Sequence, residues 1–322
     1  MKALPKKIKF SEDTIKRLDV FLAEQLETSR SQAQKIIEDN DVSINDKKAN
    51  KAGLMLKTND QIKIEKKVVE KLTPKATAEK KEKEKIPDLK IVEITKDYIV
   101  VEKPNGLLTH STDKNEAASV ATILSKKYPE LKKVGDDPKR PGIVHRLDKE
   151  ASGLLVVARN QAMFDHLKKQ FKDRTVNKEY SVLVHGKVNK DSDFIKFNLE
   201  RARSGERMSA LPSTVRGELN TTGKDALTEF WVEQRFINFT LLKVKIHTGR
   251  MHQIRVHFLA YDNPLVGDPL YFQKKHKDRW DKACGRMFLH CTRLGFTDLD
   301  GEYKEFTSEL PKKLADFLLL LK

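Results

Sequence analysis

Cysteine is nearly absent from this chain, which contains only Cys284 and Cys291 among its 322 residues. Two cysteines exclude the dense disulfide framework that stabilises small secreted domains. Together with His290 they could be imagined as metal ligands, but the sequence offers no Cys-x-x-Cys pair and no fourth ligand. We therefore expect no metal site and two buried, reduced thiols.

Long apolar runs are missing as well. No stretch approaches the ~20 apolar residues that a membrane-spanning helix needs. Residues 1–7 also lack the apolar core of an export signal. The sequence therefore predicts a cytoplasmic protein without a membrane partner.

A glycine-rich phosphate loop of the Walker or Rossmann type does not occur, which argues against a nucleotide cofactor. Positive charge, by contrast, is abundant, because 63 Lys and Arg oppose 47 Asp and Glu and leave a net charge of +16. Such a balance favours a polyanionic partner. Basic charge alone would equally suit a membrane surface or simple solubility, so motifs must decide.

Residues 66–87 form the clearest boundary in the chain. The segment is rich in Lys and Glu and contains few residues that can bury apolar area, so we expect a mobile charged linker. A solvated helix built on Glu–Lys pairs is the alternative. The predicted organisation is a small domain at 1–65, the linker at 66–87 and a larger domain at 88–322.

The small domain combines two helices with short strands. Apolar residues recur at helical spacing from Leu18 to Leu26, and Ser29 or Ser31 can cap a second helix. Residues 42–46 and 61–64 alternate as strands do. These patterns predict a small α/β unit.

The larger domain mixes helices and strands without regular βαβ alternation. Residues 91–94 and 98–101 suggest a hairpin, 226–236 and 239–246 suggest long antiparallel strands, and 117–127, 161–172 and 249–260 suggest helices. We therefore predict an α+β fold in which helices flank a mixed or antiparallel central sheet.

The most informative segment is His-Arg-Leu-Asp-Lys-Glu-Ala-Ser-Gly-Leu-Leu at 145–155. The apolar run at 154–158 predicts a buried strand, so Asp148 lies where a loop enters a sheet. Rigidly supported loops of this kind often carry reactive groups. A structural ion pair between Asp148 and Arg146 is the plainer interpretation of the same residues.

Several segments of the chain resemble one known protein family, and they occur in the order in which that family has them. The segment at 145–155 is similar to the His-Arg-Leu-Asp-x-x-Thr-Ser-Gly pattern of the RluA-type pseudouridine synthases, and the other similar segments are 101–107, 177–186, 248–257, 264–271 and 287–291. The resemblance spans about residues 89–321. Two positions depart from the pattern, since Ala151 replaces the usual Thr and Glu102 the usual Asn. Loss of the hydroxyl at 151 would cost about 1 kcal/mol without removing the carboxylate.

The resemblance implies that the protein isomerises uridine to pseudouridine within RNA, with no cofactor or metal. It assigns the essential carboxylate to Asp148, which would either attack the nucleotide or remove a ribose proton. Arg255 would pair with Asp148, and Tyr180 would stack on the flipped uracil and approach the proton that leaves C5. Arg146 would fill the gap left by the base, and Arg250 and His252 would contact RNA.

The small domain resembles the S-four-type RNA-binding domain of ribosomal proteins, through residues 17–22, 29–33, 42–45 and 60–62. It departs from it at Asn40-Asp41, where a Gly usually closes the second helix. The resemblance implies RNA contacts for Arg17, Ser29 and Arg30, and ribosomal RNA or a pre-ribosomal particle as the partner of a monomeric enzyme. A generic helical protein-interaction module is the alternative.

Two other functions fit parts of the sequence. A non-catalytic RNA-binding or ribosome-assembly factor on the same fold would be expected to lack Asp148 or Tyr180, and both are present. A glycosylase or glycoside hydrolase would need a second acid, for which Glu150 offers itself. The histidines at 247, 252 and 257 recur every five residues, which is not a zinc-site spacing, and are interpreted as structural or RNA-contacting.

Overall fold

The computed structural model describes residues 7–11, 16–26, 28, 30–39, 42–49, 51–64, 89–111, 118–202, 207–212, 214–215, 218–219, 222–273 and 279–321. The chain divides into two compact units, Met1–Lys85 and Ile86–Lys322. The predicted linker at 66–87 lies outside the described residues.

The described part of the first unit contains two helices and six short strands. Their bounds are β1 Lys7–Lys9, β2 Lys16–Arg17, α1 Leu18–Gln25, α2 Arg30–Glu38, β3 Val42–Ile44, β4 Lys47–Lys48, β5 Met55–Leu56 and β6 Gln61–Ile64. Strands β1, β6, β3 and β4 form an antiparallel sheet in that order, while β2 pairs with β5. The expected helices and strands are thus present.

A separate apolar core holds this unit together. Leu18 and Leu22 of α1 are fully buried against Ile37 of α2 and Ile62 of β6. The ring of Phe10 meets the ring of Phe21 edge to face, with centroids 5.2 Å apart. The helical spacing of the apolar residues therefore places one face of each helix on the sheet.

The second unit is built on a nine-stranded sheet. Its elements are β7 Lys90–Ile94, β8 Tyr98–Lys103, α4 Val120–Lys127, a 3-10 turn Pro129–Lys133, β9 Ser152–Ala158, α5 Gln161–Asp173, β10 Asn177–His185, β11 Ser192–Lys196, β12 Leu199–Arg201, β13 Met208–Ala210, β14 Thr214–Val215, β15 Glu218–Leu219, β16 Leu227–Arg235, β17 Phe239–Ile246, α6 Gln253–Ala260, α7 Arg279–Cys284, β18 Leu289–Thr297, β19 Tyr303–Thr307 and α8 Lys312–Leu318. The strand order is β11-β16-β17-β10-β18-β9-β8-β7, with β19 paired to β18. Only the β18–β9 pair is parallel among these described strands, so the sheet is mixed.

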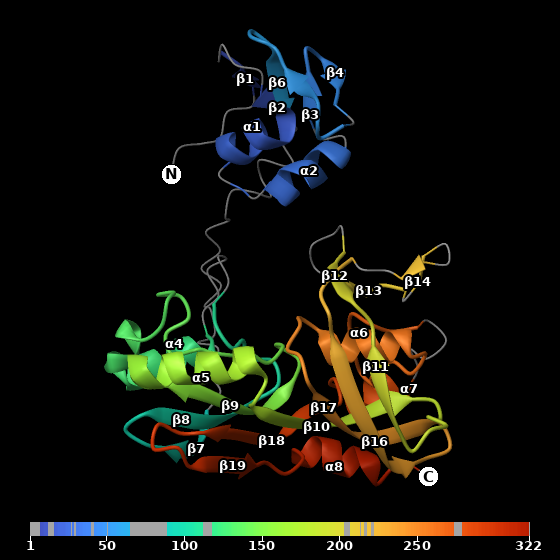
Figure 1. The fold of residues 1–322 in the computed structure, drawn as a ribbon. Coiled ribbons are helices and arrows are strands. Elements are labelled where there is room, and N and C mark those ends of the chain that lie inside the picture. Colours follow the sequence, from blue (N-terminus) through green and yellow to red (C-terminus); the bar gives the residue numbers. More distant parts are fainter. Residues whose placement is uncertain are drawn as a thin grey trace. The chain divides into compact units, whose positions relative to one another are not determined.

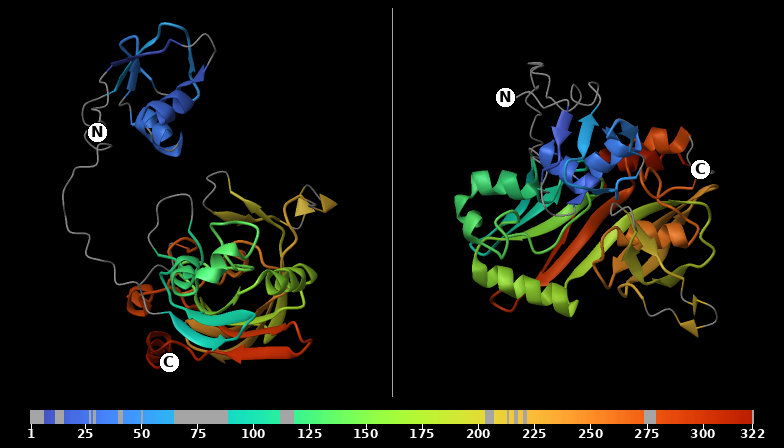
Figure 2. Two further views of the ribbon diagram at one scale, coloured as in Figure 1. Left: turned by 90° about the vertical axis from the view of Figure 1, so that its left-hand side faces the viewer. Right: turned by 90° about the horizontal axis from the view of Figure 1, so that it is seen from above.

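Helices cover both faces of this sheet. Figure 1 shows α4, α5 and α6 on one face and α8 on the other, and the turned view in Figure 2 (left) shows the same layering. The predicted α+β class, with helices flanking a mixed sheet, is confirmed. In the described part of the chain, no helix is both long enough and apolar enough to cross a membrane.

Strand β9 lies at the centre of the core and leads the chain away from the candidate catalytic loop. All seven of its residues are buried between β8 and β18, as the uninterrupted apolar run predicted. Gly153 has φ +117°, and a Cβ there would lie 2.3 Å from the carbonyl oxygen of Cys291 on the neighbouring strand. Glycine at 153 therefore lets β9 approach β18 directly after the loop.

One predicted helix is shorter than expected. The sequence suggested a helix over 249–260, but α6 begins at Gln253 and His252 precedes it with a left-handed φ of 55°. The Gln253 side chain accepts hydrogen bonds from the backbone N–H of Arg250 and from the hydroxyl of Thr248. These contacts hold 248–252 as a turn, so the predicted helix over 249–260 was too long at its start, and Arg250 and His252 lie in the turn before it.

Candidate active site

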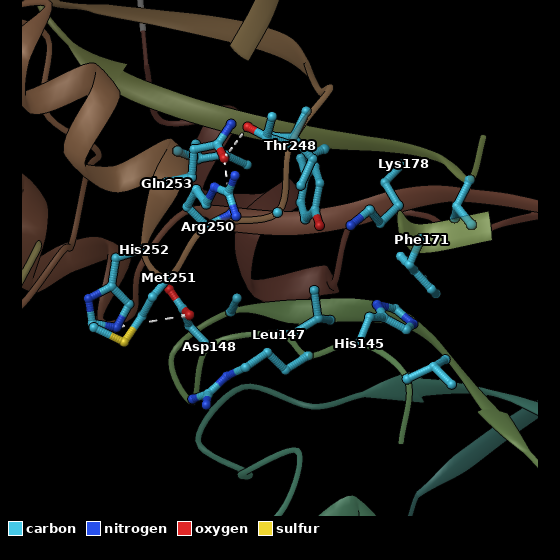
Figure 3. A pocket seen from close by; sticks show the side chains of 18 of the residues that line it. His145, Leu147, Asp148, Phe171, Lys178, Thr248, Arg250, Met251, His252 and Gln253 are labelled. Carbon is cyan, nitrogen blue, oxygen red and sulfur yellow. Dashed lines mark hydrogen bonds and ion pairs between the residues drawn. The ribbon is translucent and has the colours of Figure 1, made fainter. Parts of the chain in front are cut away.

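The second unit contains a pocket with a volume of about 600 Å³. It is formed by the loop that precedes β9, by the end of α5 with the start of β10, and by the turn that precedes α6 (Figure 3). Seven Lys or Arg residues line it, whereas Asp148 is the only carboxylate among its described lining residues. The pocket is thus strongly basic around one acid, which suits a polyanionic ligand.

The backbone on both sides of Asp148 is fixed by the segment that follows β8. The hydroxyl of Thr109 donates to the carbonyl of Leu147 (2.9 Å) and accepts from its N–H (3.2 Å). The N–H of Gly106 donates to the carbonyl of Lys149 at 2.7 Å. On the loop that carries Asp148, these bonds use only the backbone groups of Leu147 and Lys149, so none of them involves the carboxylate of Asp148.

Lys103 ties the two segments together from within the core. Its fully buried amine donates to the carbonyl oxygens of Leu107 (2.7 Å), Pro104 (2.9 Å) and Lys149 (3.3 Å). Burial lowers the pKa of Lys103 to about 7. Sequence reasoning placed Lys103 in a family-like segment but gave it no role, because nothing local marks a lysine as buried.

Arg255 of α6 forms the ion pair with Asp148 that the sequence predicted. Its Nη1 lies 3.1 Å from Oδ2 of Asp148 and 3.6 Å from a carboxylate oxygen of Glu150. The guanidinium also stacks over the ring of Tyr271 at 5.0 Å from its centroid. Oδ2 of Asp148 is therefore occupied, whereas Oδ1 receives no hydrogen bond from the described residues.

Asp268 is the stronger partner of Arg255, and sequence reasoning missed it. Its carboxylate, with 0% of the side chain exposed, accepts from Nε (2.7 Å) and Nη2 (2.8 Å) of Arg255. The backbone N–H groups of Leu270 and Tyr271 donate to the same carboxylate. The Gly267-Asp268-Pro269 segment was noted as family-like, but only the tertiary structure brings Asp268 to Arg255.

His252 lies beside the free oxygen of Asp148. Its Nε2 is 4.0 Å from Oδ1 of Asp148, and its Nδ1 is 2.9 Å from the hydroxyl of Tyr271. That hydroxyl also accepts from the N–H of Met208 in β13. Burial is the main reason that the pKa of His252 is lowered, although the charge of Asp148 opposes the shift.

Tyr180 projects from β10 into the same pocket and is almost fully buried. Burial, and then the neighbouring Cys291 and Asp148, raise the pKa of Tyr180 well above its ordinary value. The hydroxyl is therefore protonated at neutral pH. The ring of Tyr180, held in this way, can stack on a base. Its hydroxyl can donate its proton to another group only if it takes up a new proton afterwards.

The two arginines expected to contact RNA differ in their environment. Arg146 is an exposed pocket residue, and no described carboxylate lies within ion-pair distance of it. The plainer interpretation, a salt bridge to Asp148, is therefore not observed. Arg250 also lines the pocket and donates from Nε to the carbonyl of Asp225 at 3.0 Å.

The three regularly spaced histidines have separate partners. His247 Nε2 lies 2.8 Å from Glu229, and His257 contacts the hydroxyl of Thr228 and the carbonyl of Phe197. No group of three or more His, Cys, Asp or Glu in the described residues is arranged to hold a metal ion. The histidines therefore act singly, as structural or pocket-lining groups.

In the first unit, Arg17 and Arg30 converge on one buried carboxylate. Both place Nε 3.0 Å from Asp19, whose side chain is 0% exposed, and Gln34 donates to it at 2.9 Å. Burial opposes ionisation of Asp19, but these hydrogen bonds lower its pKa below the usual range. Both guanidinium groups are partly exposed and keep donors that have no partner among the described residues, whereas Ser29 lies outside them.

Comparison with known proteins gives a consistent result for both units. Residues 97–260 match the family model described as RNA pseudouridylate synthase, and residues 16–62 match that of the S4 domain. An uncharacterised RNA pseudouridine synthase of Bacillus subtilis is 33% identical over 95% of this chain and 94% of its own. The ribosomal large subunit pseudouridine synthase D of Haemophilus ducreyi is 31% identical over 95% and 90%.

The fold also resembles a solved structure. The human RNA pseudouridylate synthase domain containing 1 shares 26% identity, with a TM-score of 0.57 over 72% of this chain and 88% of that one.

Proposed function

Because the chain belongs to the RNA pseudouridylate synthase family, we propose that it converts uridines of large-subunit ribosomal RNA to pseudouridine, with Asp148 as the essential carboxylate. The activity class follows from the family, so the protein is an RNA pseudouridine synthase. The observation that best supports the role of Asp148 is its position: it is the one carboxylate among the described residues of a basic pocket and is held by Arg255 beside Tyr180.

Ribosomal RNA as the substrate is supported by the relatives and by charge. Relatives from Haemophilus ducreyi and Borreliella burgdorferi are named ribosomal large subunit pseudouridine synthase D. Positive charge occurs in both parts of the sequence, since residues 1–87 hold 21 Lys and Arg against 15 Asp and Glu, a net +6 of the total +16. Two basic units suit an extended RNA contacted at two places.

Access to the base is the first chemical requirement. The uridine must leave its stack, which costs a few kcal/mol. Arg146 is exposed at the pocket and free of ion pairs with described residues, so its planar guanidinium is available to occupy the vacated position or bind a phosphate. The exposed Lys172 lines the same pocket and is available for a neighbouring phosphate, and the exposed Arg174 beside it pairs with Asp225 at 3.7 Å.

Bond cleavage is assigned to Asp148. Arg255 holds Oδ2, so Oδ1 is the oxygen left to attack the nucleotide or to remove a ribose proton. Both routes need an ionised, oriented carboxylate. The guanidinium of Arg255 fixes that orientation, because Asp268 binds two of its nitrogen atoms and leaves the third to bind Asp148.

The last step removes a proton from C5. Tyr180 is close enough to the pocket to stack on uracil, but its raised pKa keeps the hydroxyl protonated. It therefore takes the C5 proton only while passing its own proton on, and Asp148 is the acceptor in the same pocket. Tyr180 acts in this proposal as a relay and not as a free phenolate.

The decisive experiment is a pseudouridine map of ribosomal RNA from cells with and without this protein. Purified wild-type protein, Asp148→Asn and Glu150→Gln are then assayed on the unmodified large-subunit RNA, with filter binding measured in parallel. We expect no product from Asp148→Asn, unchanged RNA binding and continued turnover by Glu150→Gln.

Other results would redirect the assignment. Product from a clean Asp148→Asn preparation would remove the essential role of Asp148. Loss of activity in Glu150→Gln as well would favour a two-carboxylate mechanism. RNA binding by the wild type without any new pseudouridine would leave a non-catalytic RNA-binding factor.

A further inference from the structure

Lys178 lies two residues before Tyr180 on β10 and lines the same pocket. Side chains two apart on a strand share one face, about 7 Å from each other. The amine of Lys178 is 5.1 Å from the ring centroid of Phe171. It also lies close to Gly249, because a Cβ added at that glycine would be 3.9 Å from the amine nitrogen. In Figure 3 the amine points from the strand into the pocket. A base stacked on Tyr180 would therefore lie next to it.

The charge of Lys178 is not neutralised within the described part of the protein. Only 9% of the residue is exposed, yet its amine has no carboxylate within ion-pair distance and no hydrogen-bond acceptor among those residues. Burying an unpaired cation is costly, so a side chain of this kind points to a ligand that supplies the missing partner.

The titratable groups that face Lys178 are all neutral near pH 7. Burial, and then the charge of Lys178, lower the pKa of His145 well below its ordinary value. Burial raises the pKa of Cys291 to about 12 and that of Tyr180 well above its usual range. Burial lowers the pKa of Lys178 itself to about 8, so it is still mainly charged at pH 7.

We propose that Lys178 stabilises the negative charge that uracil acquires when its bond to the ribose breaks. This inference rests on the proposed function and assigns a further catalytic residue to the same site. The position argues for the base and against a phosphate, because Lys178 is buried beside Tyr180, whereas Arg140, Lys172 and Arg174 are exposed around the pocket.

The electron balance explains why a cation is needed at this point. The C1′–N1 bond breaks with its electron pair on N1, and the resulting charge spreads over the ring and its two carbonyl oxygens. The ribose is meanwhile held by Asp148 or has given it a proton. C5 then forms the new bond to C1′ with the electrons of the anion, the proton leaves C5, and N1 is protonated. A preorganised cation stabilises the anion without having to reorganise.

The test compares two leaving groups. An RNA oligonucleotide spanning the mapped uridine is made with uridine or 5-fluorouridine at the target, and the nucleoside joined through C5 is measured in single turnovers after nuclease digestion. The fluorinated ring has no C5 proton to lose after the new bond forms, so its N1=C6 bond takes up water, and its product is measured as the hydrated C5-linked nucleoside. Fluorine withdraws electrons and makes the uracil anion more stable by itself. Lys178→Met should lower the rate on the uridine RNA by about 10²–10³-fold. The loss on the fluorinated RNA should be smaller, and Lys178→Arg should keep most of the activity on both.

Lys172→Met is the matched control, because Lys172 is an exposed lysine of the same pocket. Lys172→Met should weaken RNA binding, and its single-turnover rate should fall by the same factor on the uridine and the 5-fluorouridine RNA. Lys178→Met should keep the wild-type Kd for RNA and melt no lower than the wild type, since it removes an unpaired buried charge. The kcat/KM of the wild type should fall as pH rises through about 8, and this fall should move to higher pH in Lys178→Arg.

Three outcomes would overturn the proposal. Equal losses on the two RNAs would mean that Lys178 does not act on the leaving group. A weaker Kd with a shallower salt dependence would make it a phosphate contact. A lower melting temperature that accounts for the lost activity would make it structural. A wild type without activity on ribosomal RNA would instead contradict the proposed function itself.

Discussion

Replacing Arg255 by Met would separate electrostatic support of Asp148 from the packing of the fold. The substitution keeps much of the apolar stem and removes a guanidinium that is bound by two carboxylates. Asp268 would then be left buried with two backbone N–H donors and no cation. Removing one partner of such a pair costs ~3–5 kcal/mol. For a domain of this size, that loss corresponds to a fall of roughly 6–20 °C in the melting temperature.

Loss of activity alone would therefore be ambiguous, and a second variant resolves it. In Arg255→Met/Asp268→Asn the stranded charge is gone, while the Asn oxygen still accepts from the N–H groups of Leu270 and Tyr271. We expect the double variant to recover most of the lost stability, because replacing both members of a buried pair is often nearly neutral. It should remain inactive, because Asp148 has lost the group that orients it.

The assays are thermal denaturation followed by circular dichroism and single-turnover pseudouridine formation on ribosomal RNA. Arg255→Lys keeps the charge, but its single amine cannot bind Asp148 and also make two hydrogen bonds to Asp268. We therefore expect this variant to melt close to the wild type and to form pseudouridine slowly. A double variant that is both stable and as fast as the wild type would refute the reasoning. It would show that Asp148 needs no cation beside it.

Three further predictions concern other parts of the chain. Tyr180→Phe should keep the fold and RNA affinity but stall after bond cleavage, which rapid-quench analysis would detect; wild-type turnover would show that the hydroxyl is idle. Deleting residues 1–87 should leave a folded, active unit with weaker binding to large ribosomal RNA fragments and a shallower salt dependence; an unfolded product would contradict the boundary. Because the pKa of Asp19 is lowered in the folded state, its ionised carboxylate contributes to the free energy of unfolding. That contribution is complete above the pKa of about 3.9 that an Asp has in the unfolded chain, and it is lost as pH falls below this value. Asp19→Asn should remove this acid sensitivity from the isolated residues 1–85 at the cost of lower stability, as circular dichroism between neutral and acidic pH would show; an unchanged acid transition would mean that other groups control it.

Local sequence determined the secondary structure wherever the pattern was strong. The alternation of β16 and β17 predicted these strands within one residue, and the apolar run predicted β9 except for its first two residues. The prediction failed at the start of α6, where the Gln253 side chain takes the N–H of Arg250 and holds a turn in place of a helical one. Side-chain contacts of this kind compete with the helix and cannot be seen in the periodicity of apolar residues.

Family resemblance in the sequence also predicted that Asp148 is the essential carboxylate and that Arg255 pairs with it, and the structure shows that ion pair. The resemblance could not indicate how that pair is held, because Asp148 and Arg255 are 107 residues apart and Asp268 joins them only through the packing of α6. Burial is the other property that only the tertiary structure decided. Lys103 and Lys178 look like ordinary surface lysines in the sequence, but β8 and β10 carry them inside the sheet layers, where loss of solvent lowers the pKa of both.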